Sequence, residues 1–271
     1  MTIMHWNPVG IATNRLGFLL LRSRRWIIQI ASFIVINSYF FPWLKRIPCS
    51  GLNCYACPGA IFACPVGTLQ QFAVVHQIPL YTLGFLGLIG ILVGRLSCGW
   101  FCPFGLLQDY LYRIKTPKLK LSNRFGWIRY LVLILLVGVI PYFTLELWFS
   151  KLCPLGTLEG TLPIIITNVD LRQLIGGMFV VKIVILVLFL AWMVITQRPF
   201  CRFVCPLGAI YSPFNRLSSF QIKVDSNKCV KCNRCQEVCP TETKIYLDTH
   251  NSQCIRCLDC VKACPAGAID I

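Results

Sequence analysis

The chain has 271 residues, of which 56% are hydrophobic and only 13% are charged, and its mean hydropathy is +0.67. This composition is too apolar for a soluble domain of this size and predicts a helical membrane protein. The net charge of +16 comes without a nucleic-acid-binding motif, so we assign it to loops that face anionic lipid headgroups and expect no nucleic-acid partner.

Four long apolar segments follow a short N-terminal segment, residues 1–25. Each is close to the ~20 residues that a helix needs to cross a bilayer. The expected spans are residues 26–44, 78–96, 127–149 and 173–196. Tryptophans flank the first and third spans, as is usual where indole rings lie at the membrane interfaces. The sequence therefore predicts an all-α membrane domain with four transmembrane helices over residues 26–220.

The positions of lysine and arginine predict the orientation of these spans. Clusters of cations lie in the N-terminal segment and between the second and third spans, whereas the other two loops hold few. The clustered cations are Arg15, Arg22, Arg24 and Arg25, and then Arg113, Lys115, Lys118, Lys120 and Arg124. By the positive-inside rule, both termini and the middle loop are cytoplasmic and the loops 45–77 and 150–172 face outward. We expect a multi-pass protein of the cytoplasmic membrane.

The membrane domain reads as a duplication, with halves at residues 26–125 and 126–220. Cys64-Pro-Val-Gly in the first half matches Cys153-Pro-Leu-Gly in the second. Likewise, Cys98-Gly-Trp-Phe-Cys102-Pro-Phe-Gly matches Cys201-Arg-Phe-Val-Cys205-Pro-Leu-Gly. Matching elements fall at the same membrane side, so we expect a pseudo-twofold axis along the membrane normal.

This symmetry predicts a [4Fe-4S] cluster at the cytoplasmic ends of the second and fourth spans. Each half supplies two thiolates, and the expected ligands are Cys98, Cys102, Cys201 and Cys205. The alternative is that these four are ordinary core or surface cysteines.

Five further cysteines lie in the two outward loops: Cys49, Cys54, Cys57, Cys64 and Cys153. We expect Cys54, Cys57, Cys64 and Cys153 to hold a second membrane cluster, with Cys49 as the spare thiol. Disulfides are the alternative, because this face opens to a potentially oxidising compartment. The odd number of cysteines and the repeated Cys-Pro-x-Gly element favour metal.

Residues 221–271 carry two runs of the spacing Cys-x2-Cys-x2-Cys-x3-Cys-Pro, which predicts an α+β bacterial-type ferredoxin domain with two [4Fe-4S] clusters. In this arrangement the fourth cysteine of each run binds the cluster of the other run. The expected sets are Cys229, Cys232, Cys235 and Cys264 for one cluster, and Cys254, Cys257, Cys260 and Cys239 for the other. Zinc is the alternative, although its sites usually use paired knuckles without the third cysteine.

Few other side chains carry chemistry. With only His5, His76 and His250 in the chain, a pair of axial ligands within the spans is lacking and we expect no haem. His76, Glu146 and Lys182 lie near or within spans and are candidates for a quinone site; Glu146 and Lys182 could instead pair with each other. Asp109 reads as a solvated interface residue.

Clusters on opposite faces of a hydrocarbon core of about 30 Å are too far apart for one fast electron hop. Either the cysteine loops dip inward among the helices, or a quinone or partner cofactor bridges the gap.

Four spans, two inner Cys-x3-Cys-Pro elements and a C-terminal two-cluster module resemble the membrane ferredoxin family of NapH, NosR and CcoG-type proteins. The resemblance covers residues 78–271 and implies electron exchange between a quinone pool or cytoplasmic donor and an outward-facing redox partner subunit. The CcoG resemblance implies an alternative, a reductase in metal or cofactor maturation. A further alternative is an anchoring subunit of a larger redox complex.

Overall fold

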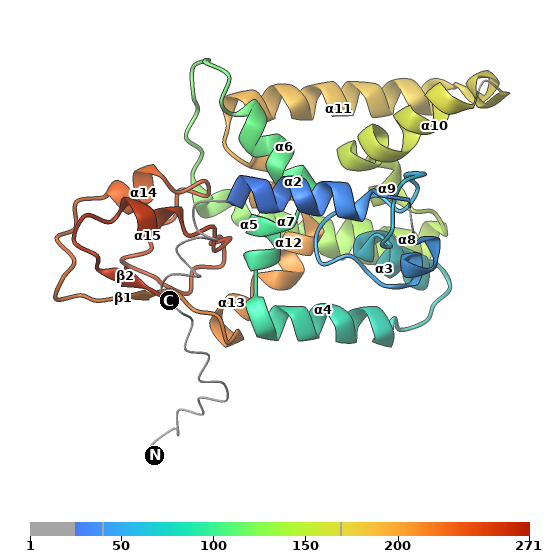
Figure 1. Ribbon diagram of the computed structural model, residues 1–271. Helices are drawn as coiled ribbons and strands as arrows, with labels where there is room; N and C mark the ends of the chain where they lie inside the picture. Colours follow the sequence, from blue (N-terminus) through green and yellow to red (C-terminus); the bar gives the residue numbers. More distant parts are fainter. Residues whose placement is uncertain (1–24, 40, 169) are drawn as a thin grey trace.

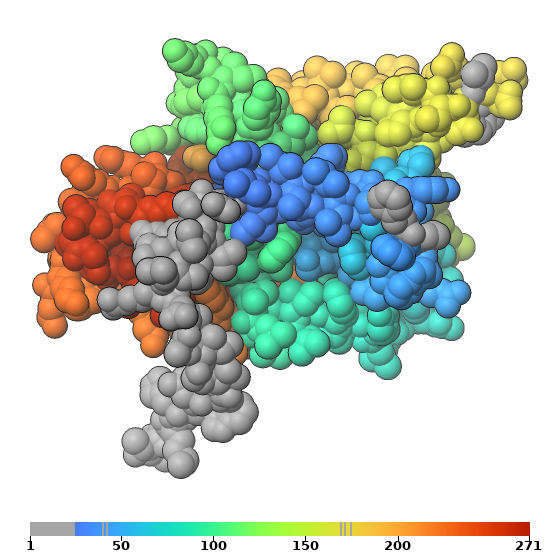
Figure 2. All heavy atoms as spheres, viewed as in Figure 1, coloured from blue at the N-terminus to red at the C-terminus, as the bar shows by residue number. Residues whose placement is uncertain are grey.

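The structure, a computed structural model, describes residues 25–39, 41–168 and 170–271. Residues 1–24, with most of the predicted N-terminal segment and its cations, lie outside the described residues. Apolar helices run side by side, and the C-terminal region lies at one end of them (Figure 1). Figure 2 shows that this region, in orange to red, packs directly against the helix ends. The opposite end of the helices carries α3, α8, α9 and α10 (Figure 1).

The first half contains short apolar helices, and a long loop over residues 47–64 separates η1 from α3. Its elements are α2 (Arg25–Ile36), η1 (Pro42–Arg46), α3 (Pro65–Val74), α4 (Leu80–Val93), α5 (Leu96–Trp100) and α6 (Pro103–Leu111). α4 ends because Gly94 takes a positive φ of 58°, a left-handed backbone that glycine adopts at little cost. Pro103 then begins α6 at a position where the missing N–H is not needed.

The second half contains the two longest helices. η2 (Asn123–Trp127), α7 (Ile128–Leu131), η3 (Val132–Val139) and α8 (Ile140–Thr144) join into one helix, Asn123–Thr144. After it come α9 (Trp148–Leu152), η4 (Gly156–Thr161), α10 (Leu162–Thr167), η5 (Asp170–Leu174), α11 (Gly177–Ile195), η6 (Phe200–Val204), α12 (Pro206–Tyr211) and α13 (Phe214–Leu217).

The C-terminal region has little regular structure. It contains β1 (Lys223–Val224), α14 (Arg234–Glu237), α15 (Asp259–Ala263) and β2 (Ile269–Asp270). The two strands pair antiparallel, with Lys223 opposite Asp270. This sheet joins the start of the region to its end.

Two of the expected spans are helices long and apolar enough to cross a membrane: Asn123–Thr144 and Gly177–Ile195. The other two expected spans contain α2, with 12 residues, and α4, with 14. At 1.5 Å per residue, the described part of α2 is roughly 18 Å long and α4 roughly 21 Å, both less than the ~30 Å hydrocarbon core. Hydropathy gave longer segments because apolar residues continue past the ends of both helices.

Candidate iron–sulfur centres

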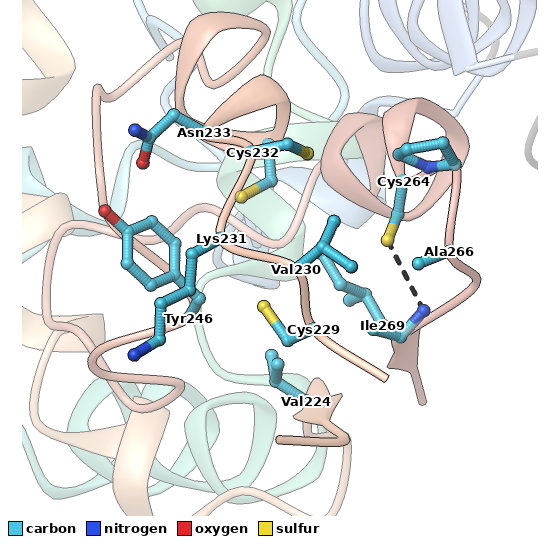
Figure 3. A pocket seen from close by; sticks show the side chains of 13 residues that line it. Val224, Cys229, Val230, Lys231, Cys232, Asn233, Tyr246, Cys264, Ala266 and Ile269 are labelled. Atoms are coloured by element: carbon cyan, nitrogen blue, oxygen red, sulfur yellow. Dashed lines mark hydrogen bonds between the residues drawn. The ribbon is translucent and has the colours of Figure 1, made fainter. Parts of the chain in front are cut away.

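The first centre of the C-terminal region is a cavity of about 380 Å³ beside β1 and β2. Cys229, Cys232, Cys235 and Cys264 line it, together with apolar side chains. Figure 3 shows the sulfur atoms of Cys229, Cys232 and Cys264 around this space, and the Cys264 sulfur accepts a hydrogen bond from the amide of Ala268 at 3.3 Å. The run from 229 and the last cysteine of the chain therefore meet here, as the spacing predicts.

The second centre is a cavity of about 320 Å³, lined by Cys239, Cys254, Cys257 and Cys260, with Cys235 between it and the first. The hydroxyls of Thr241 and Thr243 lie 3.4 and 3.1 Å from the Cys239 sulfur. Burial raises the pKa of Cys254 to about 11, so an empty site holds a neutral thiol and metal binding displaces its proton.

The third centre gathers cysteines from both halves of the membrane domain. Cys98, Cys102, Cys201 and Cys205 are all buried, with only 5–6% of each exposed. The thiol of Cys102 interacts electrostatically with those of Cys98 and Cys201, and the thiol of Cys205 interacts with all three others. The four predicted inner cysteines therefore lie together.

The Cys-Pro-x-Gly sequence has a clear structural basis. Cys64, Cys102 and Cys205 each occupy the N-cap of a helix in extended backbone, and the following proline begins the helix. The sulfurs of Cys64 and Cys205 accept hydrogen bonds from the glycine amides three residues on, at 3.4 and 3.3 Å. A helix N-terminus favours negative charge, so this motif presents a thiolate where the helix dipole stabilises it.

Polar groups around the inner cysteines suit an anionic iron–sulfur cluster. Gln108 donates a hydrogen bond to the Cys201 sulfur at 3.1 Å. The Tyr211 hydroxyl is fully buried, interacts electrostatically with Cys98 and Cys205, and has no hydrogen-bond partner among the described residues. A cluster with its sulfides would give this buried donor an acceptor.

The fourth centre is an outer cavity of about 600 Å³ with three cysteines, Cys54, Cys64 and Cys153, in its lining. Lys182 and Asn53 also line it, and both amide atoms of the fully buried Asn53 lack a partner in the described part of the chain. The predicted Cys64 and Cys153 pair therefore meets, and an anionic group fits between them, Lys182 and Asn53.

Two other outer cysteines lie apart from that lining. Cys57 follows Cys54 in a tight turn, its amide donating to the Cys54 carbonyl at 3.1 Å. Cys49 is buried and lines a separate apolar crevice between α2 and α4. All 17 cysteines of the chain lie within the described residues and have free thiols.

Sequence reasoning missed Glu159, on η4. Its carboxylate accepts a hydrogen bond from the Cys54 amide at 3.1 Å, and burial raises its pKa to about 7. Glu159 also interacts electrostatically with Cys49 and Cys153. Loop 150–172 contains only two carboxylates, Glu159 and Asp170. This scarcity was the only signal for Glu159 in the sequence.

The loop between η1 and α3 reaches the inner centre. The Cys102 thiol donates to the Leu52 carbonyl at a sulfur–oxygen distance of 3.9 Å. A Cβ on Gly51 would lie 3.1 Å from the Cα of Cys102, so only a glycine allows this close approach without adjustment. Since Leu52 also lines the outer cavity, one residue touches both centres.

The C-terminal region contacts the inner centre from the other side. A Cβ on Gly99, within the first Cys-x3-Cys motif, would lie 2.4 Å from the carbonyl oxygen of Ile255. The indole of Trp100 donates to the Arg256 carbonyl at 3.1 Å. Cys257 belongs to the same buried apolar cluster as Cys98 and Cys102.

The three quinone candidates do not share one site. His76 is exposed, and its ring lies 4.2 Å from that of Tyr142 in an edge-to-face contact. Glu146 pairs with Lys151 at 2.7 Å, whereas Lys182 lines the outer cysteine cavity. The expected Glu146–Lys182 pair is therefore not formed, because a lysine five residues along the chain is the nearer partner.

Asp109 is not the solvated interface residue that the sequence suggested. It accepts from Arg25 and Arg198 at 2.5 Å each, and Arg25 also bonds Asp259 of α15 at 2.6 Å. Burial raises the pKa of Asp109, but the two arginines outweigh this effect and hold its pKa below the usual value. These ion pairs link α2 and α6 to the C-terminal region.

Among the described residues, no three histidine, cysteine or acidic side chains stand close enough together to hold a single metal ion.

Comparison with known families gives two matches, both to iron–sulfur domains. A 4Fe-4S binding domain matches residues 75–127 and 178–225, and a 4Fe-4S dicluster domain matches residues 221–265. The first two segments each contain one Cys-x3-Cys-Pro element. No solved structure matches.

Curated relatives agree with these domains. Uncharacterized protein MJ0750 of Methanocaldococcus jannaschii is 31% identical over 67% of this chain and 74% of its own length. Ferredoxin-type protein NapH of Haemophilus influenzae is 27% identical over 79% of this chain and 71% of its own length. Regulatory protein NosR of Stutzerimonas stutzeri is 29% identical over 59% of this chain, but only 22% of its own length. The chain is an iron–sulfur electron-transfer protein that belongs to the NapH/NosR-like membrane ferredoxin family.

Proposed function

We propose that this chain carries electrons across the cytoplasmic membrane along four [4Fe-4S] clusters. The clusters use the cysteine sets predicted from the sequence, with two in the C-terminal region, one at the inner centre and one at the outer centre. The observation that carries this proposal is the continuous contact of the four cysteine groups. When bound, the clusters supply one-electron redox chemistry.

Each step along this line has a structural contact behind it. Cys235 lies between the two cavities of the C-terminal region. Cys257 packs in one buried cluster with Cys98 and Cys102. Leu52 then joins Cys102 to the outer cavity. The loop between η1 and α3 thus replaces the wide gap that two clusters at opposite membrane faces would leave.

The topology that suits this role has four spans, with both termini and the C-terminal region in the cytoplasm. In this topology α2 and α4 are too short to cross the bilayer by themselves, and the neighbouring loops complete the crossing. An outward-facing redox subunit then exchanges electrons at the outer cluster. His76, which lies away from the four cysteine groups, is the proposed contact of a quinone at the membrane surface.

The direct test is electron transfer across a sealed membrane. The full chain is reconstituted anaerobically in liposomes that contain a membrane-impermeant acceptor dye, and an impermeant reductant is added outside. We expect the trapped dye to be reduced by the wild-type chain and by Cys49→Ala, but not by Cys201→Ala. Equal dye reduction with wild type and Cys201→Ala contradicts conduction through the inner cluster.

A quinone titration of the same liposomes tests the quinone proposal separately. We expect a menaquinone analogue to oxidise the reduced protein in the wild type more rapidly than in His76→Ala. If the quinone analogue does not oxidise the reduced clusters, quinone is removed from the proposed function. The proposed electron path through the four clusters is not affected by that result.

A further inference from the structure

Arg95 is a fully buried cation at the junction between the inner centre and the C-terminal region. One guanidinium nitrogen donates to the Ser252 carbonyl at 2.7 Å, and another donates to the Cys201 carbonyl at 3.1 Å. Its Nε has no partner among the described residues. Within that part of the chain no carboxylate pairs with Arg95, so its charge is held by neutral carbonyls alone.

Buried arginines around the junction are of two kinds. Arg198 and Arg202 each pair with a carboxylate, Asp109 and Glu242 respectively. Arg95 and Arg129 have no carboxylate partner among the described residues, and Arg129 donates to Gln253 and Ser252 instead. Burying an unpaired charge costs several kcal/mol, so a missing counter-ion is expected near Arg95. A cubane with four thiolates, whose charge is roughly −2 when oxidised, supplies that anion.

The position of Arg95 relates it to two centres rather than one. Its hydrogen bond to the Cys201 carbonyl places it against a ligand of the inner centre. Its hydrogen bond to the Ser252 carbonyl places it two residues from Cys254 of the C-terminal region. The same guanidinium therefore favours negative charge on both sides of the junction.

We propose that Arg95 is the shared counter-charge of two clusters, the inner one and the one held by Cys239, Cys254, Cys257 and Cys260. The proposal rests on the proposed function, because it needs both clusters. Arg95 stabilises the more negative, reduced form of each cluster and raises both reduction potentials. It also offsets the repulsion that an electron on one cluster exerts on the other.

The test is a redox titration of the intact chain, followed by electron paramagnetic resonance, in Arg95→Gln and Arg95→Lys. A unit charge close to a cluster stabilises the more negative state of that cluster by direct Coulomb attraction, which is screened little in a buried site. We therefore expect Arg95→Gln to lower the reduction equilibrium constant of both adjacent clusters about tenfold, which is about 59 mV for one electron. Arg95→Lys should keep both potentials close to wild type.

Two controls separate this effect from general loosening of the fold. The cluster of Cys229, Cys232, Cys235 and Cys264 lies beyond the junction and should titrate as in wild type in both variants. Arg216→Gln removes an exposed arginine from α13 and should move no potential.

A second variant removes a negative charge near the same two clusters, so its expected effect on their reduction potentials is opposite to that of Arg95→Gln. Asp109→Asn leaves Arg198 without its carboxylate, and Arg198 interacts electrostatically with both Cys201 and Cys257. The potentials of the two clusters should then rise, which gives a result even if Arg95→Gln does not fold. Unchanged potentials in whichever of these variants retain all four clusters overturn the proposal. A wild-type protein without an inner cluster instead overturns the proposed function.

Discussion

The inner and outer cysteine centres use the duplication of the membrane domain differently. The inner centre takes matching pairs, Cys98 with Cys102 and Cys201 with Cys205, from the two halves. The outer centre shares only Cys64 and Cys153 between the halves, and Cys54 comes from a cysteine-rich loop that the second half lacks. Each centre therefore draws cysteines from both of the proposed halves, and the loop without a counterpart in the second half brings the outer centre into contact with the inner one.

Their electrostatic surroundings differ as well. Buried Arg95 and Arg198 lie beside the inner cysteines, whereas the outer cavity is lined by Lys182, and the half-buried carboxyl of Glu159 accepts from the amide of Cys54. Positive charge stabilises a reduced cluster and a nearby carboxylate opposes it. We therefore expect the buried arginines to raise the reduction potential of the inner cluster above the value that burial alone would give.

The largest expected effect comes from breaking the symmetric centre. Cys98→Ala and Cys201→Ala should each remove about four irons per chain, since both residues serve one cluster. Iron analysis and electron paramagnetic resonance check this outcome, and both clusters of the C-terminal region should stay visible. If either variant retains the full iron content, the shared inner cluster is wrong.

The outer centre is tested by pairing across the halves. Cys64→Ala, Cys153→Ala and the double variant should all lose the same cluster, so the double variant loses no more iron than either single one. Cys49→Ala is the matched control and should lose none. Separate, additive losses in the double variant would show that Cys64 and Cys153 serve different metals.

A smaller effect is expected where the C-terminal region joins the membrane helices. Asp109→Asn should lower the free energy of unfolding by about 2–3 kcal/mol, because two largely buried arginines lose a carboxylate. Thermal unfolding of the cluster-loaded protein in detergent measures this loss. A change within about 0.5 kcal/mol would mean that the link carries little stability.

The same link predicts a pH dependence. The folded protein holds the pKa of Asp109 below its ordinary value, so its contribution to stability is present above about pH 4 and is lost as the pH falls through the lower, folded-state pKa. The difference in melting temperature between wild type and Asp109→Asn should therefore shrink at acid pH. A difference that grows on acidification contradicts this sign.

The smallest effect concerns the exposed Glu146–Lys151 pair at the outer end. Lys151→Ala should change the unfolding free energy by less than about 1 kcal/mol, since both partners are substantially exposed and water screens their attraction. Denaturant unfolding measures the change. A loss as large as that of Asp109→Asn would show that this pair is part of a larger network.

Residue spacing predicted the family, and the comparisons confirm it. Spacing also grouped the cysteines of the C-terminal region that line the same cavities, because a short spacing fixes which thiols one turn of the chain can present together. Hydropathy was less exact, since apolar runs do not reveal where α2 stops or where Gly94 turns the chain. The sequence did not single out Arg95 or Glu159, and it assigned Asp109 wrongly to a solvated interface. Their roles depend on partners 84 or more residues away, which only the folded chain brings close.

The most direct test of the proposed path along four clusters is the iron and acid-labile sulfide content of the full chain, purified and reconstituted without oxygen. Four cubanes in one chain predict about 16 irons and about 16 sulfides per polypeptide. A reproducible content of about eight of each, with both clusters in the C-terminal region, would contradict the account, because no metal would then connect that region to the outer face.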